Sequence, residues 1–168
     1  MAIRDPELDV VLAALLRAFC EFVVVGGFAV IAHRHVRATE DVDLLIPDDD
    51  ANDRRVLEAL SSLEAITTST QRPPAARDLA SRAHLRVLTR AGLVDLIREG
   101  DPPLDYATVA THAITADLGD GLFKIAGLRT LVAMKRLADR PRDRLDLEAL
   151  EEQHGPLPLD PLPGLDDR

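Results

Sequence analysis

Two aspartates, Asp41 and Asp43, follow shortly after a pair of glycines, Gly26 and Gly27. In a strand, residues two apart share one face at a separation of about 7 Å, so both carboxylates can reach one or two divalent cations. Adjacent glycines let the backbone turn sharply and approach a ligand closely. A helix opening from that turn points free N–H groups at the ligand, which suits a phosphate. The spacing therefore predicts metal-assisted chemistry on a phosphate-bearing substrate.

The elements that must position these residues can be predicted from the flanking sequence. Residues 22–25 form an apolar, β-branched run that suits a buried strand ending at the glycines. Residues 28–32 are compatible with a short helix, and residues 41–46 with a second strand. In that strand, Val42 and Leu44 face away from the two aspartates. We therefore expect residues 22–47 to form a hairpin-like unit that presents the carboxylates.

A third carboxylate, Asp95, lies within an apolar run at residues 93–97. Residues 84–89 and 93–97 indicate a hairpin that turns through residues 90–92. A lone charge in such a strand is costly unless it is paired or coordinated. The alternative is an aspartate on an edge strand that faces water, because the period of two allows one polar face.

The glycine pair and the paired aspartates together resemble the DNA polymerase β-like nucleotidyltransferase superfamily. The fuller pattern, GG-x-A followed by R-x-T-x-D-x-D within residues 26–43, is similar to the minimal nucleotidyltransferases, including the type IV toxin family of abortive-infection systems. The resemblance implies transfer of NMP from an NTP to a hydroxyl acceptor with release of pyrophosphate, and Mg²⁺ or Mn²⁺ as cofactor. RNA such as tRNA is the favoured acceptor, with a protein or a small molecule as alternatives, and an antitoxin is an implied partner.

The resemblance also assigns roles to individual residues. Asp41, Asp43 and Asp95 match the catalytic, metal-binding carboxylates, with two ions about 3.5–4 Å apart in the full arrangement. Nucleotide contacts are implied for the glycine pair and for three further residues: Gly26, Gly27, Arg37, Thr39 and Lys135. The second hypothesis is a catalytically silent nucleotidyltransferase-like domain that binds or senses nucleotides.

The segment around Lys135 is similar to the toxin-like nucleotidyltransferases, in which a helical lysine precedes a D-x-x-D pattern. Asp143 and Asp146 match that pair. Lys135 is one of two lysines beside eighteen arginines, and the two interpretations are a triphosphate contact and a surface lysine on an amphipathic helix. For Asp143 and Asp146 we favour pairing with neighbouring arginines or capping of the last helix over metal binding.

Other chemistries find little support in the sequence. The glycine pair lacks the pattern of a dinucleotide fold or a P-loop, and no serine nucleophile elbow is present. His33 and His35 have no further histidine or cysteine at ligand spacing, which favours a helix end or a surface position over a metal site. Of the basic residues near the aspartates, Arg37 is the best candidate for a phosphate contact because it matches the R-x-T-x-D-x-D pattern.

Composition limits the remaining choices. The chain has 168 residues, of which 46% are hydrophobic, and a formal net charge of −9. This size suits one compact domain, and the charge argues against nonspecific DNA binding over the whole surface. Cys20 is the single cysteine, so we expect a buried thiol rather than a disulfide. The sequence has neither a signal pattern nor an apolar run long enough to span a membrane, so we expect a cytoplasmic protein.

The expected fold class is α+β: a small mixed β-sheet with helices packed on it, nucleotidyltransferase-like, followed by a C-terminal helical segment. We expect one domain at 1–152, with the catalytic sheet at about 5–100 and a hairpin and helices at about 104–152. Residues 153–168 are rich in proline and are expected to be disordered. A helix capped by Asp5 should precede the first strand, and residues 71–83 should form a loop. Further elements are expected as helices at 51–63, 106–112, 128–139 and 143–152, a strand at 65–70, and a hairpin at 114–118 and 122–125.

Overall fold

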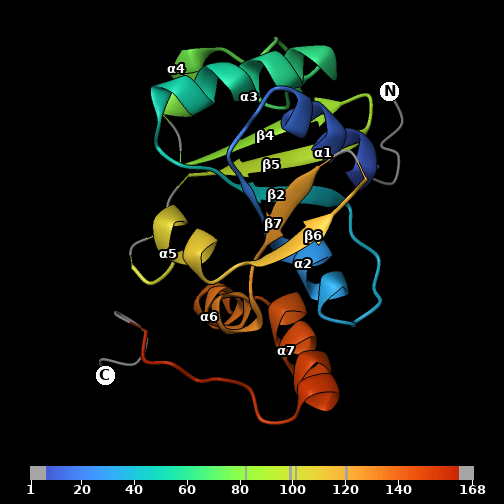
Figure 1. Cartoon of the computed structure of the whole chain (residues 1–168), viewed down its shortest axis with the longest axis vertical. Coiled ribbons are helices and arrows are strands. Elements are labelled where there is room, and N and C mark those ends of the chain that lie inside the picture. The colour runs from blue at the N-terminus through green and yellow to red at the C-terminus, as the bar shows by residue number, and fades with distance from the viewer. Residues whose placement is uncertain (1–6, 82, 99, 101, 120, 163–168) are drawn as a thin grey trace.

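The computed structural model describes residues 7–81, 83–98, 100, 102–119 and 121–162. In chain order the elements are α1 (Leu8–Arg17), β1 (Val23–Val24), α2 (Gly26–Ala32), β2 (Asp41–Leu45), α3 (Asp50–Ser62), β3 (Ile66–Thr67), α4 (Ala76–Ala80), β4 (His84–Thr89), β5 (Gly92–Ile97), α5 (Tyr106–Thr111), β6 (Ile114–Asp117), β7 (Leu122–Ile125), α6 (Leu128–Ala138) and α7 (Pro141–His154). Within this part of the chain, helices and strands alternate up to β4, and two strand pairs, β4–β5 and β6–β7, and a final helix pair, α6–α7, follow (Figure 1).

In the described residues, all strands join one sheet in the order β3-β4-β5-β2-β1-β7-β6. Strand β2 pairs in parallel with β5, and β1 in parallel with β7, whereas the other neighbours are antiparallel. The sheet is therefore mixed, and helices pack on it. The predicted α+β class with a C-terminal helical segment is confirmed.

The segment from Phe22 to Pro47 folds as a strand, a helix and an antiparallel strand. Val24 of β1 lies opposite Leu44 of β2. Strand β1 is shorter than predicted, because the chain enters α2 at Gly26 itself and both glycines belong to the helix. The backbone pairing continues one step further, since Val25 N–H donates to the Asp43 carbonyl at 3.0 Å. The glycine turn is thereby fixed beside the paired aspartates.

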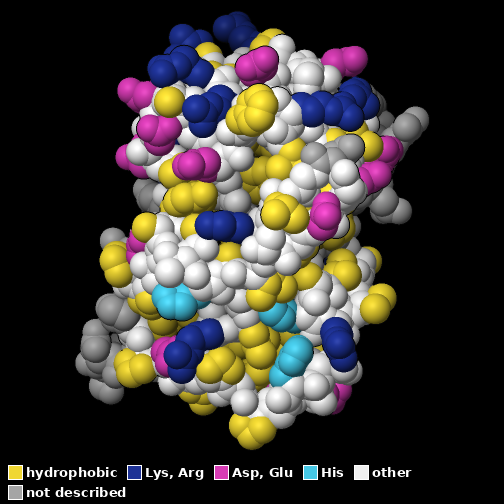
Figure 2. All heavy atoms as spheres, viewed as in Figure 1, with side chains coloured by type: hydrophobic (Ala, Val, Ile, Leu, Met, Phe, Trp, Pro, Cys, Tyr) yellow, Lys and Arg dark blue, Asp and Glu magenta, His cyan; other side chains and the backbone are white. Residues whose placement is uncertain are grey.

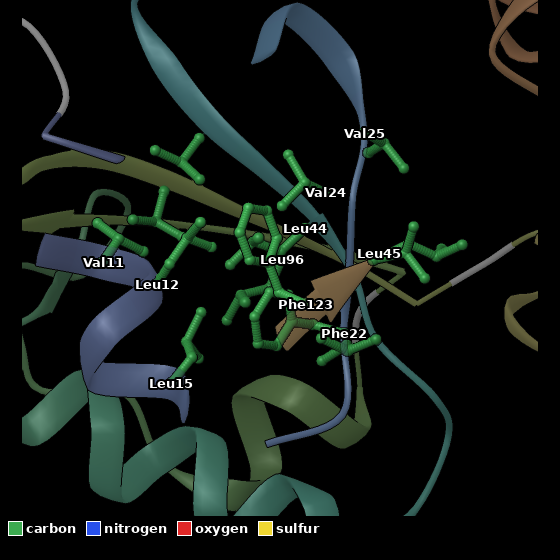
Figure 3. Close-up of a cluster of buried hydrophobic side chains, with 14 of the residues drawn as sticks. Val11, Leu12, Leu15, Phe22, Val24, Val25, Leu44, Leu45, Leu96 and Phe123 are labelled. Atoms are coloured by element: carbon green, nitrogen blue, oxygen red, sulfur yellow. The ribbon is translucent and has the colours of Figure 1, made fainter. Parts of the chain in front are cut away.

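The hydrophobic core on one face of the sheet anchors this unit. Figure 3 shows α1 presenting Val11, Leu12 and Leu15 toward apolar side chains of the central strands. Leu44 of β2 and Leu96 of β5 pair in register and are each at most 2% exposed. The alternate residues of the same strands then point to the opposite face, which carries the aspartates. Burial of one face thus fixes the direction of the carboxylates.

Two helices at the C-terminal side complete the arrangement. Helices α6 and α7 lie together at the end of the molecule opposite α3 and α4 (Figure 1). Helix α7 starts at Pro141, two residues before the predicted start, because proline suits the first helical position. Leu131 of α6 and Leu150 of α7 belong to the same hydrophobic cluster as the central strands. The predicted domain boundaries themselves stay a prediction.

Several local expectations differ from the structure. Residues 71–83, predicted as a loop, contain α4, whose N-terminus is closed by a hydrogen bond from Ala75 N–H to the Asp78 carboxylate at 2.9 Å. Strand β3 covers only Ile66–Thr67 of the predicted 65–70. The predicted cap at Asp5 lies outside the described residues. The triple aspartate at 48–50 behaves as predicted, because Asp49 accepts a hydrogen bond from Asn52 N–H at 2.6 Å and caps α3.

The tail also differs from the expected disorder in its described part. Helix α7 continues to His154, and beyond Gly155 the chain is extended up to Leu162. Leu162 is 2% exposed and packs with Leu104 and Ala133. Burial of this leucine offsets the entropy that a proline-rich segment would otherwise retain. Residues 163–168 lie outside the described part of the chain.

Charged side chains of both signs lie on the surface (Figure 2). Figure 2 shows basic and acidic side chains interspersed over the end of this face formed by α3 and α4.

Cys20 is only partly buried, and burial raises its pKa to about 12. Among the described residues, no helix combines the length and apolar character that crossing a membrane requires.

Candidate active site

The three predicted carboxylates converge on one face of the sheet. Asp43 of β2 lies directly opposite Asp95 of the parallel strand β5, and Asp41 lies two residues before Asp43. One carboxylate oxygen from each of the three lies within 4.8 Å of the others. Asp95 is only 2% exposed, and β5 lies between β4 and β2, so Asp95 is not the water-facing edge residue that we considered as an alternative. We call Asp41, Asp43 and Asp95 the acidic triad.

A cation of the protein already bridges the acidic triad. Arg86 of β4 donates from Nε to Asp95 Oδ1 at 2.8 Å and from Nη2 to both Asp95 Oδ2 at 2.5 Å and Asp41 Oδ2 at 2.7 Å. His84, on the same strand, lies 2.9 Å from Asp95 Oδ1 through Nε2. The Arg86 side chain is 43% exposed, so solvent reaches it from one side. The position where the triad gathers its oxygens therefore attracts positive charge.

The carboxylates of the triad differ in their pKa values. Burial, followed by the charges of Asp41 and Asp95, raises the pKa of Asp43 to about 6, although the Gly27 N–H acts in the opposite direction. Burial and the charge of Asp95 also raise the pKa of Asp41. Burial alone would raise the pKa of Asp95, but hydrogen bonds and charge from Arg86 outweigh it and lower the pKa. Three acids with one full cation leave the triad short of positive charge.

The glycine pair leaves room for the triad. Gly26 has φ +59°, a left-handed conformation that favours glycine, and a Cβ there would overlap the Asp43 carboxylate. A Cβ on Gly27 would overlap the Thr39 hydroxyl, which donates to the Asp41 carbonyl at 3.2 Å. The two glycines therefore let the N-terminus of α2 approach the strand that carries the aspartates.

These groups border an open cavity of about 400 Å³, which we call the polar cavity. All eight predicted site residues line it: Gly26, Gly27, Arg37, Thr39, Asp41, Asp43, Asp95 and Lys135. The structure thus brings together residues from α2, β2, β5 and α6, together with the chain that leads into β2. Asp143 also borders the cavity, whereas the lining residues do not include Asp146.

A second group of charges, the buried ion cluster, adjoins the polar cavity. Lys135 Nζ donates to Asp143 Oδ1 at 2.9 Å and lies 2.7 Å from Asp146 Oδ2. Arg37 Nε lies 2.9 Å from Asp146 Oδ1, and Arg140 Nε donates to Asp143 Oδ2 at 2.7 Å. Asp143 therefore pairs with the neighbouring Arg140, as favoured from the sequence, whereas Asp146 pairs with Arg37, which is distant in the sequence. Lys135 is 5% exposed and is not a surface lysine.

Charge compensation dominates in the buried ion cluster. Burial would raise the pKa of Asp143, but hydrogen bonds from Arg140 and Lys135 outweigh it and lower the pKa. The bond to Asp143 likewise raises the pKa of Arg140. Lys135 borders the polar cavity, but its ammonium group is already shared between two carboxylates.

The segment that precedes β2 is tied to the C-terminal helices. Arg142 Nη2 of α7 donates to the Ala38 carbonyl at 2.6 Å, and Arg37 pairs with Asp146 of the same helix. His33 caps α2 and donates from Nε2 to the Ala126 carbonyl at 2.8 Å, so it has a structural contact. Among the described residues, the acidic triad is the one cluster with metal-ligand geometry, and it includes neither His33 nor His35.

Four residues at the cavity were not predicted: His84, Arg86, Arg140 and Arg142. Arg86 could have been found, because a turn after Thr89 places Arg86 opposite Asp95 in the antiparallel hairpin. His84 follows from the same alternation on β4. Arg140 and Arg142 reach the cavity through the packing of α7, for which the sequence carries no local signal.

The donor set fits a hard divalent cation. Three carboxylates supply the oxygen ligands that Mg²⁺ and Mn²⁺ prefer. The Arg86 guanidinium places positive charge at oxygens of the same triad. Because Gly26 has no Cβ, the Asp43 carboxylate has room to join them. A metal that displaced Arg86 would also relieve the repulsion that raises the pKa values of Asp41 and Asp43.

An acidic triad on adjacent strands, beside a glycine turn on a mixed sheet, is the arrangement that the sequence led us to expect for a nucleotidyltransferase. Residues 11–162 match the family model described as nucleotidyl transferase AbiEii toxin, type IV TA system. The chain therefore belongs to the AbiEii family of nucleotidyltransferase toxins, and the resemblance drawn from the sequence is confirmed.

Solved structures support the fold. ANT(2″)-Ia in complex with adenylyl-2″-tobramycin superimposes with a TM-score of 0.59 at 13% identity, over 88% of this chain and 87% of the other. A nucleotidyltransferase-like antigenic protein from Paracoccidioides brasiliensis gives 0.55 at 16% identity, over 88% and 76%. JHP933 from Helicobacter pylori gives 0.52 at 15% identity, over 88% and 64%. Among curated proteins, no sequence matches this chain.

Proposed function

We propose that the protein transfers NMP from an NTP to a hydroxyl acceptor, releases pyrophosphate, and requires Mg²⁺, which Mn²⁺ can replace. The observation that carries this proposal is the convergence of Asp41, Asp43 and Asp95 on an open cavity, where a guanidinium already bridges two of them. Family membership supports nucleotidyl transfer in general, and the triad supports its dependence on a divalent cation.

In this proposal the triad would hold the metal, which when bound supplies positive charge for hydroxyl activation and for the triphosphate. Gly26 and Gly27 would cradle the β- and γ-phosphates, with Thr39 and Arg37 beside them. Lys135 would act less by direct contact than by keeping Asp143 and Asp146 neutralised, because its ammonium already pairs with both. Positioning and electrostatic stabilisation would supply most of the rate enhancement.

The reaction would form one bond and break one. The acceptor hydroxyl oxygen attacks the α-phosphorus, the bond to the β-phosphate oxygen breaks, and pyrophosphate leaves. Asp95 is the proposed proton acceptor. Both Asp95 oxygens are engaged by Arg86, so Arg86 must turn toward solvent before Asp95 can accept the proton.

RNA such as tRNA is the acceptor that we favour. The family is one of type IV toxins, and four arginines line the polar cavity of an otherwise acidic chain: Arg37, Arg86, Arg140 and Arg142. Of these, Arg86, Arg140 and Arg142 are exposed and are available to a phosphate backbone. A small-molecule acceptor is the alternative, because the similar ANT(2″)-Ia is bound to adenylyl-2″-tobramycin. We also propose an antitoxin partner, which the type IV description supports.

The test incubates the purified protein with Mg²⁺, each labelled NTP, and either total tRNA or tobramycin. The wild type and an Asp50→Asn control, which changes an exposed carboxylate on α3, should label the acceptor. Asp43→Asn should lose at least 100-fold of the rate, since removal of a charge-stabilising group costs about that much. Equal transfer by all three proteins would refute the metal assignment.

A catalytically silent binding domain is the second candidate, and the bridging Arg86 is the observation that favours it. Its bonds to Asp95 and Asp41 occupy oxygens that a metal needs. Titration of the wild type with Mn²⁺, followed by electron paramagnetic resonance, separates the two candidates. Binding that Asp43→Asn abolishes supports the enzyme, whereas binding that appears only in Arg86→Met supports the silent domain.

A further inference from the structure

A second cavity, of about 500 Å³, adjoins the polar cavity, and we call it the apolar cavity. The two cavities share six lining residues: Gly26, Asp43, Ile97, Lys135, Arg140 and Asp143. The acidic triad and the buried ion cluster therefore stand at the boundary between them. A ligand held at this boundary can extend into both.

The apolar cavity has a different chemistry from its neighbour. Beyond the shared boundary, its walls are formed by aliphatic and sulfur-containing side chains and by proline rings, among them Val25, Leu45, Leu104, Leu131, Met134 and Leu162. Among the lining residues that the structure describes, the charged side chains all belong to the shared boundary. The volume lies within the range of small-molecule sites, about 300–1,000 Å³. The cavity thus suits a flat, weakly polar group attached to a charged one.

The described end of the chain forms part of the wall. Residues 155–162, which we call the C-terminal strap, place Leu162 against Leu104 and Ala133. Two arginines of α6 fix the strap: Arg136 Nη1 donates to the Asp160 carbonyl at 2.8 Å, and Arg129 Nε pairs with the Asp160 carboxylate at 2.8 Å. The strap is therefore anchored to the helix that also carries Lys135.

We propose that the apolar cavity binds the nucleobase of the NTP, with the C-terminal strap as part of its wall, while the triphosphate lies in the polar cavity. This inference rests on the proposed function. Burial against aliphatic walls favours any base. Among the described lining residues beyond the shared boundary, no side chain carries an N–H or O–H donor, so apolar burial supplies most of the binding energy of the base.

The experiment measures binding of a non-hydrolysable ATP analogue and of inorganic tripolyphosphate by calorimetry with Mg²⁺. Ala138 lines the apolar cavity and is exposed, so Ala138→Phe adds a ring at the cavity wall without replacing a buried side chain. Ala107→Phe is the matched control, since Ala107 is also exposed and helical but lies on α5, outside both cavities. Leu162→Ser tests the strap separately, with thermal unfolding as the check on folding.

In the wild type and in Ala107→Phe, the analogue should bind at least tenfold more tightly than tripolyphosphate. Ala138→Phe should abolish this difference and leave tripolyphosphate binding unchanged, and Leu162→Ser should reduce the difference. Equal binding of the two ligands to the wild type would overturn this assignment alone. If Ala138→Phe still preferred the analogue over tripolyphosphate as the wild type does, the assignment would also be overturned, even if this variant had lost transfer to the acceptor. Failure of both ligands to bind would overturn the proposed function together with this assignment.

Discussion

The acidic triad and the buried ion cluster border the same cavity but balance their charges differently. In the triad, three carboxylates share one full cation, Arg86, and the pKa of Asp43 is raised to about 6. In the buried ion cluster, Asp143 and Asp146 share Lys135 and two arginines, and the pKa of Asp143 is lowered. One group lacks positive charge and the other is compensated.

The difference separates a site that is prepared for a ligand from a group that supports it. Uncompensated negative charge beside an opening costs stability, and such a cost is typical of sites that bind a cation. Buried charges that are neutralised by ion pairs hold together the elements that carry them. Neutralising Asp43 in the triad and removing Asp146 from the buried ion cluster should therefore change the free energy of unfolding in opposite directions.

The largest effect is expected in the buried ion cluster. Asp146→Ala would leave Lys135 and Arg37 without this partner in a buried position, and the free energy of unfolding should fall by about 3–5 kcal/mol. Urea denaturation measures the loss, with Asp50→Ala on the exposed surface of α3 as the control. A loss no greater than that of the control would show that the cluster is not a structural support.

Arg86→Met tests the single cation of the triad. Without metal, the variant should lose about 1–2 kcal/mol, because charge-assisted hydrogen bonds contribute about 1.5–3 kcal/mol and the 43% exposure of this side chain weakens them. Saturating Mn²⁺ should restore the loss, since the metal replaces the guanidinium. The measurement is urea denaturation with and without Mn²⁺, with Arg77→Met on exposed α4 as control. No recovery with Mn²⁺ would argue against a cation site.

Asp43→Asn should stabilise the metal-free protein at pH 7, opposite in sign to Asp146→Ala. In the wild type, the pKa of Asp43 is about 6 in the folded state and near 3.9 in the unfolded state. Ionised Asp43 therefore lowers the free energy of unfolding by about 1–3 kcal/mol above pH 6. As the pH falls from 6 to 4, the wild type takes up a proton on folding and gains stability, so the advantage of the variant disappears.

Denaturation in EDTA at pH 7 and pH 4.5 measures this difference, with Asp50→Asn as the control. A variant that is less stable than the wild type at pH 7 would contradict the charge imbalance assigned to the triad. A gain that is equal at both pH values would contradict the raised pKa of Asp43.

The smallest effect is expected for Arg140→Ala. The side chain of Arg140 is 75% exposed, and Asp143 keeps its bond to Lys135, so the loss should stay below about 1 kcal/mol. Thermal unfolding beside Asp146→Ala measures the contrast. A loss comparable to that of Asp146→Ala would place Arg140 within the supporting network instead of at its rim.

The sequence predicted the parts of the site that depend on local pattern. Alternation in β2 placed Asp41 and Asp43 on one face, and the hairpin turn after Thr89 placed Asp95 within a strand. The family resemblance, not the turn, indicated that this strand lies next to the paired aspartates. The glycine pair marked the turn because no other residue fits beside the Asp43 carboxylate. Such signals survive in the sequence because they depend on near neighbours.

The remaining parts depend on contacts between distant segments. Arg142 reaches the Ala38 carbonyl only because α7 packs beside the segment that precedes β2. Helix α4 was missed because two prolines precede it, and the strap because the burial of Leu162 requires α6 and Leu104 to be in place. In each case tertiary packing overrides the local preference of the chain.

The contacts of Arg37 and Ala38 with α7 have a consequence for synthesis on the ribosome. The three aspartates have been made by residue 95, but the segment that carries Arg37 cannot meet Arg142 and Asp146 until these two residues of α7 have been made as well. Lys135, Arg140 and Arg142, which border the polar cavity, and the C-terminal strap are also made only after the triad. A nascent or truncated chain therefore carries the triad without its complete surroundings. The order of translation delays assembly of the site until nearly all of the described chain has been made.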